Sequence, residues 1–436
     1  MLTISAQKKV IFDRARCCQC GVCLASCKWN AFSHSFGSDG LLDITIDEDK
    51  CSVCGLCEQV CPAHQLPNDR VSEEQIHSAK AIRIGHAKDN RIRYLSSSGG
   101  TARTLIEDVL TTGGFDAVYS LVFPVASERL SEHPESIPDL ILEPPDSVTF
   151  TRLEAEGTWL TTFPPIEQIP CSLYRSIPWG KNLDQCTPTW RKILLVGLPC
   201  QIKGAKLLLK YRLRNTEIIS VAIFCRKQKT LGHTKCIKRM VGAPDSPTAN
   251  VFYRGHGWPG MSGVHKNAEI LKIPYFYHAR CWTVPACHLC ADCMAPAHAD
   301  ITLADPWSIE NPQDNPAGSN LIFSWTAAGK DILEQAHAKL VLSECDTEKA
   351  IMSVEFRQIR EKIDAIPYYS GHEKSRLRRL RYCLMDLITY LTEVELNLIH
   401  PNSRIIRWQL CIRRLMVRTI RMASKTAKRI CNLPSS

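Results

Sequence analysis

The feature that most constrains how this chain can fold is a cysteine pattern that occurs twice within its first 61 residues. Each copy has the spacing C-x2-C-x2-C-x3-C, and the eight positions are Cys17, Cys20, Cys23, Cys27, Cys51, Cys54, Cys57 and Cys61. One short loop with this spacing can wrap three corners of an iron–sulfur cubane, while a fourth thiolate must arrive from elsewhere in the chain. The pattern therefore predicts a segment that folds around two 4Fe-4S clusters, and it indicates electron transfer.

The fourth ligand is expected to cross between the two copies, as it does in the bacterial ferredoxin pattern. The spacing then predicts two ligand sets, namely Cys17, Cys20, Cys23 and Cys61 for one cluster, and Cys51, Cys54, Cys57 and Cys27 for the other. One position departs from the pattern, because Lys28 follows Cys27 where proline usually stands. Cys18, next to Cys17, is expected to be an additional thiol.

Two other uses of these cysteines fit the spacing poorly. Structural zinc usually takes four tetrahedral ligands from paired C-x2-C units, often with histidine. Disulfides are not expected, because the opening MLTISAQKKV lacks the apolar core of a signal peptide. Thiols in a reducing cytosol are more often ligands than bridges. We therefore expect a cytoplasmic protein that holds iron–sulfur clusters.

The positive charge of the chain is concentrated near its C-terminal end. The net charge is +10, from 54 basic and 44 acidic residues. From Lys374 onward there are 14 basic residues against Asp386, Glu393 and Glu395, which leaves 40 basic and 41 acidic residues in the preceding part. A neutral body with a basic tail argues against a nucleic-acid partner.

The 436 residues are expected to form three domains: 1–70 as a ferredoxin-like module, 80–372 as an α/β domain and 373–436 as a basic helical tail. In the second domain, apolar strand-like segments at 115–123, 192–196, 217–224, 300–303 and from 321 alternate with segments of helical spacing. This alternation predicts a multidomain α+β and α/β fold with parallel strand pairing. Residues 130–190 are expected to form an irregular or β-rich insertion.

A second group of cysteines lies in the α/β region. Cys287, Cys290 and Cys293 stand in ACHLCADC, while Cys200 and Cys225 each follow a predicted strand. Carboxyl ends of parallel strands meet at one edge of a sheet, so these thiols can converge on one metal site. From the spacing alone, zinc, a third cluster, a redox pair and unconnected core cysteines all stay open.

From about residue 80 to 310 the chain resembles the family of beta subunits of coenzyme F420 hydrogenases and dehydrogenases. The residues that carry this resemblance are SSSGGTARTLIEDVL, VGLPCQIKGAKLL with the FCR that follows, YRGHGWPG and PACHLCADCMAPAHADITLADPW. The resemblance implies an oxidoreductase that holds FAD and at least one 4Fe-4S cluster. It also implies electron exchange with a partner such as coenzyme F420, ferredoxin or another subunit.

Carried over position by position, the resemblance implies two sites. The cluster ligands would be Cys200, Cys225, Cys287 and Cys290, with Cys293 as an additional or alternate thiol. The flavin would lie near Ser97, Ser98, Gly99, Gly100 and Thr101. Another family motif is matched by Arg254, Gly257 and Trp258, for which contact with the flavin and a purely structural role both stay open. Small residues that open a helix let backbone N–H groups approach a phosphate, which supports the first five; a flexible turn is the competing interpretation of SSSGG.

The chain departs from this family after Cys225, where it reads CRKQK rather than His-Gly, so Arg226 and Lys227 are expected to add charge beside the cluster. No G-x-G-x-x-G follows a strand, which gives no support to a nicotinamide site. No residue is identified as a catalytic acid or base. The substrate is therefore left open.

The tail is predicted to form two helices, one over 376–399 with Leu377, Leu380, Leu384, Leu387 and Leu391 at helical spacing, and a second over 404–428 with a basic stripe. The second helix fits either peripheral contact with an anionic membrane or packing on the domain or an acidic partner. The favoured function is an iron–sulfur flavoprotein oxidoreductase. The alternatives are an electron-transfer subunit of a larger complex, and a membrane-associated polyferredoxin without flavin.

Overall fold

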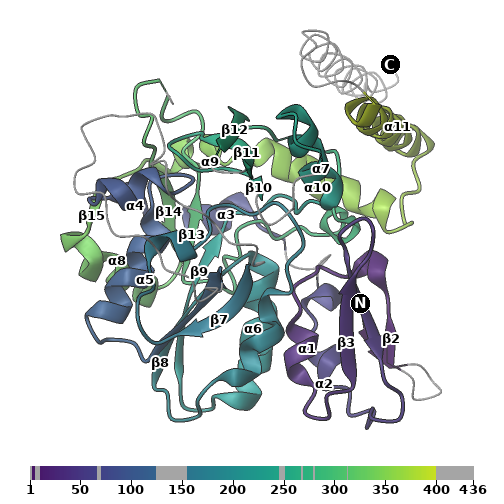
Figure 1. Cartoon of the computed structure of the whole chain (residues 1–436), viewed down its shortest axis with the longest axis horizontal. Helices are drawn as coiled ribbons and strands as arrows, with labels where there is room; N and C mark the ends of the chain where they lie inside the picture. Colours follow the sequence, from purple (N-terminus) through teal and green to yellow (C-terminus); the bar gives the residue numbers. More distant parts are fainter. Residues whose placement is uncertain are drawn as a thin grey trace, which may run out of the picture.

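The computed structural model describes residues 2–4, 10–65, 70–123, 155–244, 251–266, 269–277, 280–311 and 313–398. A small cysteine-rich module lies beside a larger domain built on one twisted sheet (Figure 1). The helix predicted over 404–428 lies outside the described residues, and so does the part of the expected insertion up to residue 154. The predictions for these two segments are not tested by the structure.

The module, drawn in purple in Figure 1, is built from short elements around the two cysteine runs. Its elements are β1 (Leu2–Ile4), β2 (Val10–Phe12), α1 (Val22–Ser26), β3 (Phe32–Phe36), β4 (Leu42–Ile46) and α2 (Leu56–Gln59). Strands β1 and β2 pair antiparallel, and so do β3 and β4. Val22, Leu42 and Val60 are fully buried. The cluster that packs within the module has only four buried members, Cys23, Leu42, Ile44 and Cys57. Such a small core is typical of modules that are stabilised by bound metal.

The main sheet has eight strands in the order β15-β5-β14-β13-β9-β8-β6-β7. They are β5 (Ala81–Ala87), β6 (Ala117–Val122), β7 (Glu156–Leu160), β8 (Lys192–Gly197), β9 (Glu217–Ile223), β13 (Ile301–Ala304), β14 (Asn320–Ser324) and β15 (Leu340–Glu344). The central strands β13, β9, β8 and β6 are parallel. The remaining pairs, toward both edges, are antiparallel.

The predicted parallel pairing therefore holds for the centre of the sheet and is wrong for its edges. Parallel neighbours need a crossover connection, which α6 supplies between β8 and β9. No helix separates β13 from β14 among the described residues, and these consecutive strands pair antiparallel. The result is a mixed sheet.

Helices cover both faces of this sheet (Figure 1). The helices of the large domain are α3 (Glu73–His77), α4 (Asn90–Tyr94), α5 (Thr101–Thr111), α6 (Pro199–Arg212), α7 (Leu231–Met240), α8 (Ala327–Gln335), α9 (Thr347–Ser353) and α10 (Phe356–Tyr369). Alternate residues of β8 face opposite layers: Leu194 packs with α5 and α8, whereas Ile193 packs with α6. The continuous apolar run of this strand is thereby buried on both faces.

A second, three-stranded antiparallel sheet lies beside α7. Its strands are β10 (Val251–Phe252), β11 (Met261–Lys266) and β12 (Glu269–Pro274). Ile237 of α7 packs against Val251 and Tyr253, which joins this sheet to the large domain.

The cysteine-rich module is fixed to the large domain at one closely packed surface. Val22 and Val60 of the module pack with Ile202 of α6. The backbone N–H of Gly180, in the 3-10 helix Trp179–Gln185, donates to the carbonyl of Cys20 at 2.7 Å. A Cβ at Gly180 would lie 2.6 Å from Val22 Cγ2, so this close approach requires glycine. The first cysteine loop therefore faces the large domain.

The last described helix, α11 (Arg376–Leu398), agrees with the first helix predicted in the tail. Asp386 accepts hydrogen bonds from Arg280 at 3.0 Å and from the Tyr369 hydroxyl at 2.7 Å. The backbone N–H of Trp282 donates to Glu393 at 2.5 Å. These contacts hold one side of α11 on the large domain. Within the described part of the chain, no helix combines the length and apolar content that crossing a membrane requires.

Candidate metal centres and cofactor site

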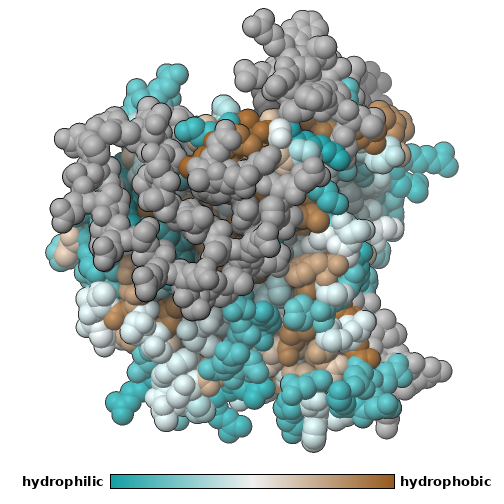
Figure 2. Space-filling view, in the orientation of Figure 1, coloured by the Kyte–Doolittle hydropathy of each residue, from teal (hydrophilic) through white to brown (hydrophobic). Residues whose placement is uncertain are grey.

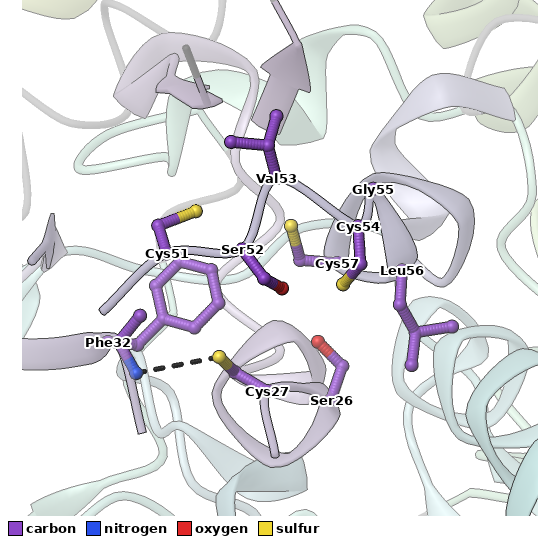
Figure 3. Close-up of a pocket in the computed structure, with 11 residues that line it drawn as sticks. Ser26, Cys27, Phe32, Cys51, Ser52, Val53, Cys54, Gly55, Leu56 and Cys57 are labelled. Carbon is purple, nitrogen blue, oxygen red and sulfur yellow. Dashed lines mark hydrogen bonds between the residues drawn. The ribbon is translucent and has the colours of Figure 1, made fainter. Parts of the chain in front are cut away.

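Three cysteines of the second run and one of the first surround a single pocket (Figure 3). Cys51 and Cys54 line it from one loop, Cys57 from the first turn of α2, and Cys27 from the end of α1. Phe32 and Leu56 contribute apolar surface to the same pocket. The backbone N–H of Ala31 donates to Cys27 Sγ at 3.5 Å. The structure thus brings together the four cysteines of one predicted ligand set, including the one that crosses.

The other predicted set also gathers, in the part of the module nearest the large domain. Burial is the main cause that raises the pKa of the Cys17 thiol, to about 12. The charges of the neighbouring Cys20 and Cys61 add to this increase. Cys23 is buried beside Cys20, Cys17 and Cys61, which raises its pKa as well. Thiols held this far from ionisation need a bound metal to become thiolates at neutral pH.

The third group of cysteines lies at the carboxyl ends of two adjacent parallel strands. Cys200 is the second residue of α6, which follows β8, and Cys225 follows β9. Burial is the main cause that raises the pKa of the Cys225 thiol. The charges of the neighbouring Cys287 and Cys290 raise it further. Cys200 lies within electrostatic reach of Cys225 and Cys290. The structure therefore gathers the four cysteines that the sequence resemblance implies.

Cys293 lies beside this group but belongs to the core. It is fully buried and packs with Ala222 and Met294. Its carbonyl accepts from the backbone N–H of Cys225 at 3.0 Å. Among the residues that the structure describes, no three His, Cys, Asp or Glu side chains converge closely enough to hold a single ion. Cys27, Cys51, Cys54 and Cys57 line a wider space, the pocket in Figure 3.

Cys18 occupies the boundary between the first and third cysteine groups. It packs with Cys61, Ala63, Ala286 and Cys290 in one cluster. Its thiol also lies close to those of Cys20 and Cys200, which affect its pKa. The sequence indicated only an additional thiol here, because the boundary forms between segments that are far apart in the chain.

Lys362 of α10 is a functional candidate that sequence reasoning missed. Its ammonium donates to the carbonyl of Arg226 and to Cys293 Sγ, the latter at 3.6 Å. Burial opposes its charge, but the neighbouring cysteines, Cys293 and Cys290 foremost, hold the pKa of Lys362 above its ordinary value. No motif marks this lysine, which lies about 70 residues beyond the ACHLCADC segment in an amphipathic helix.

The two cations that sequence reasoning expected beside the third group are arranged differently. Arg226 donates to Glu355 at 2.5 Å and to Gln358 at 2.8 Å, so an acidic partner compensates its charge. Burial, with help from the charge of Arg280, lowers the pKa of Lys227 to about 7. Lys362 is therefore the cation whose charge acts most strongly on the thiols of this group.

The predicted flavin residues form a loop that is tightly held at the end of β5. Gly99 has a φ of 68°, and a Cβ there would lie 2.7 Å from Ser319 Cα. This backbone conformation and the close contact both require glycine. The carbonyl of Gly99 accepts from the N–H of Ala87 at 2.7 Å, and Gly100 is the N-cap of α5. SSSGG is thus an ordered loop that leads into an 11-residue helix.

The polar side chains of this loop make contacts within the protein. Ser97 Oγ accepts from the backbone N–H of Ser172 at 3.0 Å. Asn320 donates to Ser98 Oγ at 3.2 Å, and the backbone N–H of Thr101 donates to Asn320 Oδ1 at 3.1 Å. Thr101 is fully buried, so its side chain has a packing role.

Trp258 lies near this loop, and Gly318 packs between the two. A Cβ at Gly318 would lie 2.5 Å from Trp258 Cβ and 3.5 Å from Gly99 N. The Trp258 ring centroid lies 5.0 Å from that of Trp307. Nε1 of Trp258 is buried and has no hydrogen-bond acceptor among the described residues.

Arg254 is buried at the same end of the domain. It donates to Asp305 at 2.7 Å and to the carbonyl of Pro259 at 2.8 Å. Its Nη2, like the indole N–H of Trp258, is buried without a partner in the described part of the chain. Buried donors usually have acceptors, and each unsatisfied one costs about 1–3 kcal/mol. Two such donors near a helix N-terminus fit a ligand rich in acceptor oxygens.

Both parts of the chain are similar to known proteins. Residues 190–350 match the family model for the C-terminal part of the beta subunit of coenzyme F420 hydrogenase/dehydrogenase, and residues 16–64 match that of a 4Fe-4S dicluster domain. A subunit of the F(420)H(2) dehydrogenase of Methanosarcina mazei is 21% identical over 344 residues, which cover 75% of this chain and 84% of that protein. A chain of the F420-reducing [NiFe] hydrogenase complex from Methanosarcina barkeri is 16% identical with a TM-score of 0.45, covering 66% of this chain and 90% of that one.

Proposed function

Because the chain belongs to the family of coenzyme F420 hydrogenase/dehydrogenase beta subunits and carries a 4Fe-4S dicluster domain, we propose that it is an iron–sulfur flavoprotein oxidoreductase. In this proposal it passes electrons between three 4Fe-4S clusters, FAD and a redox partner. The partner class is a deazaflavin such as coenzyme F420, a ferredoxin or a small organic substrate. The cysteine ligands are those of the three groups described above.

The observation that carries the proposal is the order of the three cysteine groups in space. Cys54, in the group at the outer pocket, is exposed. The group with Cys61 lies next, and Cys18 and Ala63 connect it to Cys290 of the third group. An exposed first site, a buried second site and a third site in the large domain give electrons a path from the surface inward.

The flavin part of the proposal is supported by the fit of the residues around the SSSGG loop. The N-terminus of α5 favours negative charge, and Arg254 and Trp258 supply buried donors. Bound FAD would connect the one-electron transfers of the clusters with the two-electron chemistry of hydride transfer. The protein's contribution is to bind and orient it: Asp305 fixes the Arg254 guanidinium, and Gly318 sets Trp258 against the loop.

A second candidate function is an electron-transfer subunit with no substrate of its own. It is favoured by the relative in Methanosarcina mazei, which is named as one subunit of a dehydrogenase. A purified chain that reduces or oxidises a deazaflavin unaided would exclude this candidate. Activity that appears only after a partner subunit is added would favour it.

The composition of anaerobically purified protein tests the main proposal. Three clusters imply about twelve iron atoms and twelve sulfides per chain, together with one FAD released on denaturation. Cys290→Ser should remove about four irons and leave the signals of the two module clusters. Cys345→Ser, at a cysteine outside all three groups, is the matched control and should change nothing. About eight irons without flavin would contradict the proposal and leave a two-cluster electron carrier.

A further inference from the structure

Helix α11 carries apolar side chains on the side that faces away from the protein. Its outward residues are Leu377, Leu380, Leu384, Leu387, Tyr390 and Leu391, which we call the leucine face; each is between 39% and 62% exposed. In Figure 2, brown hydrophobic side chains are visible at the upper right, where Figure 1 shows α11. A contiguous apolar surface of this kind marks an interaction site.

The leucine face is a separate surface from the one that holds the helix on the protein. Tyr382, Met385 and Leu396 of α11 are buried. At about 100° per residue, these positions lie on the opposite side from the five leucines. The ion pair of Arg280 with Asp386 and the contact of Glu393 with Trp282 fix that buried side. The protein therefore presents the leucine face outward in one orientation.

The charges around the leucine face identify its occupant. On the helix circumference Arg376 lies between Tyr390 and Leu387, and Arg381 lies just beyond Leu377, where long basic side chains can reach past an apolar surface toward anions. Lys374, Arg378 and Arg379 are exposed at the same end of the helix. The sequence that follows, residues 399–436, adds nine Lys or Arg and no Asp or Glu.

We propose that the leucine face of α11 docks the protein onto an anionic membrane surface. An apolar helix face with basic residues at its borders lies in the headgroup region of a bilayer, with the leucines in the acyl boundary. Basic residues nearby strengthen this attraction for anionic lipids. The leucines supply the apolar contact, and the basic end of the helix and the following sequence supply the charge.

The test is flotation of the full-length chain with vesicles. Wild-type protein should float with vesicles that contain phosphatidylglycerol and not with vesicles of phosphatidylcholine alone, and added salt should weaken the binding. The variant Leu380→Gln/Leu384→Gln/Leu387→Gln keeps every basic residue of the helix and the tail. Its binding should weaken by about 100-fold, because three leucines lose their apolar contact.

The matched control is Val341→Gln/Met352→Gln, which changes two exposed apolar residues outside α11 and should bind as the wild type does. Equal iron content and thermal midpoint establish that all variants are folded. The proposal is overturned if the wild-type protein does not float with anionic vesicles, or if the leucine variant floats equally well, which would assign binding to the basic sequence alone. A wild-type dimer that the leucine variant converts to a monomer, with no lipid binding, would overturn it in favour of a second copy.

Discussion

Replacement of Lys362 by methionine tests whether the third cysteine group holds a redox centre whose potential this cation sets. Methionine keeps the apolar stem and removes the charge. The ammonium lies 3.6 Å from Cys293 Sγ and acts on Cys290, Cys287 and Cys225. Because Cys293 is not one of the four ligands, the separation between the ammonium and the third centre is taken as on the order of 6 Å.

The magnitude follows from Coulomb's law. At an effective dielectric constant of about 20 and a distance of about 6 Å, one unit charge contributes roughly 3 kcal/mol to the energy of an added electron. At about 2.3 kcal/mol per 100 mV, this corresponds to a decrease of the midpoint potential on the order of 100 mV in Lys362→Met. The potential decreases because the reduced centre, which carries more negative charge, loses a stabilising cation.

The assay is a redox titration followed by electron paramagnetic resonance. The signal of the third site is identified as the one that Cys290→Ser removes. Lys362→Arg keeps the charge and should keep most of the potential, and Lys349→Met, at an exposed lysine of α9, should leave it unchanged. An unchanged or increased potential in Lys362→Met, with the signal of the third site intact, would refute the reasoning.

Three further predictions concern stability and the loop at β5. Ile202→Ala should lower the free energy of unfolding by about 2–5 kcal/mol in chemical denaturation, because this side chain is fully buried between the module and the sheet. Gly99→Ala should lower the free energy of unfolding by about 1–3 kcal/mol and reduce the flavin content, because the φ of 68° and the contact with Ser319 exclude a Cβ. Unchanged flavin content would show that the loop does not bind flavin. Asp116 accepts hydrogen bonds from the backbone N–H groups of Arg191 and Lys192 at the start of β8, which lower its pKa. Its folded pKa is below its unfolded pKa, so this stabilisation is present above the unfolded pKa and is lost as the pH falls through the folded pKa. The variant Asp116→Asn should lose that part of the acid dependence of stability. Identical acid unfolding curves for the variant and the wild type would contradict the assignment.

The sequence by itself determined the elements that local spacing encodes. The cysteine runs predicted which residues gather in the module, because three ligands of one site lie within seven residues of each other. Apolar runs such as 192–196 predicted buried strands, since their hydrophobicity is continuous. Cys200 and Cys225 were placed at one edge because adjacent parallel strands share a direction.

Only the tertiary structure decided how these pieces face one another. The closeness of Gly180 to Val22 orients the module, and Cys18 then lies between two cysteine groups. Lys362 reaches the third group from α10. These contacts join residues from about 70 to more than 180 positions apart, and they depend on how complete surfaces pack, which no local pattern specifies. The sequence determined which side chains are present to bind clusters. Packing determined which of these side chains lie close enough together to act at one site.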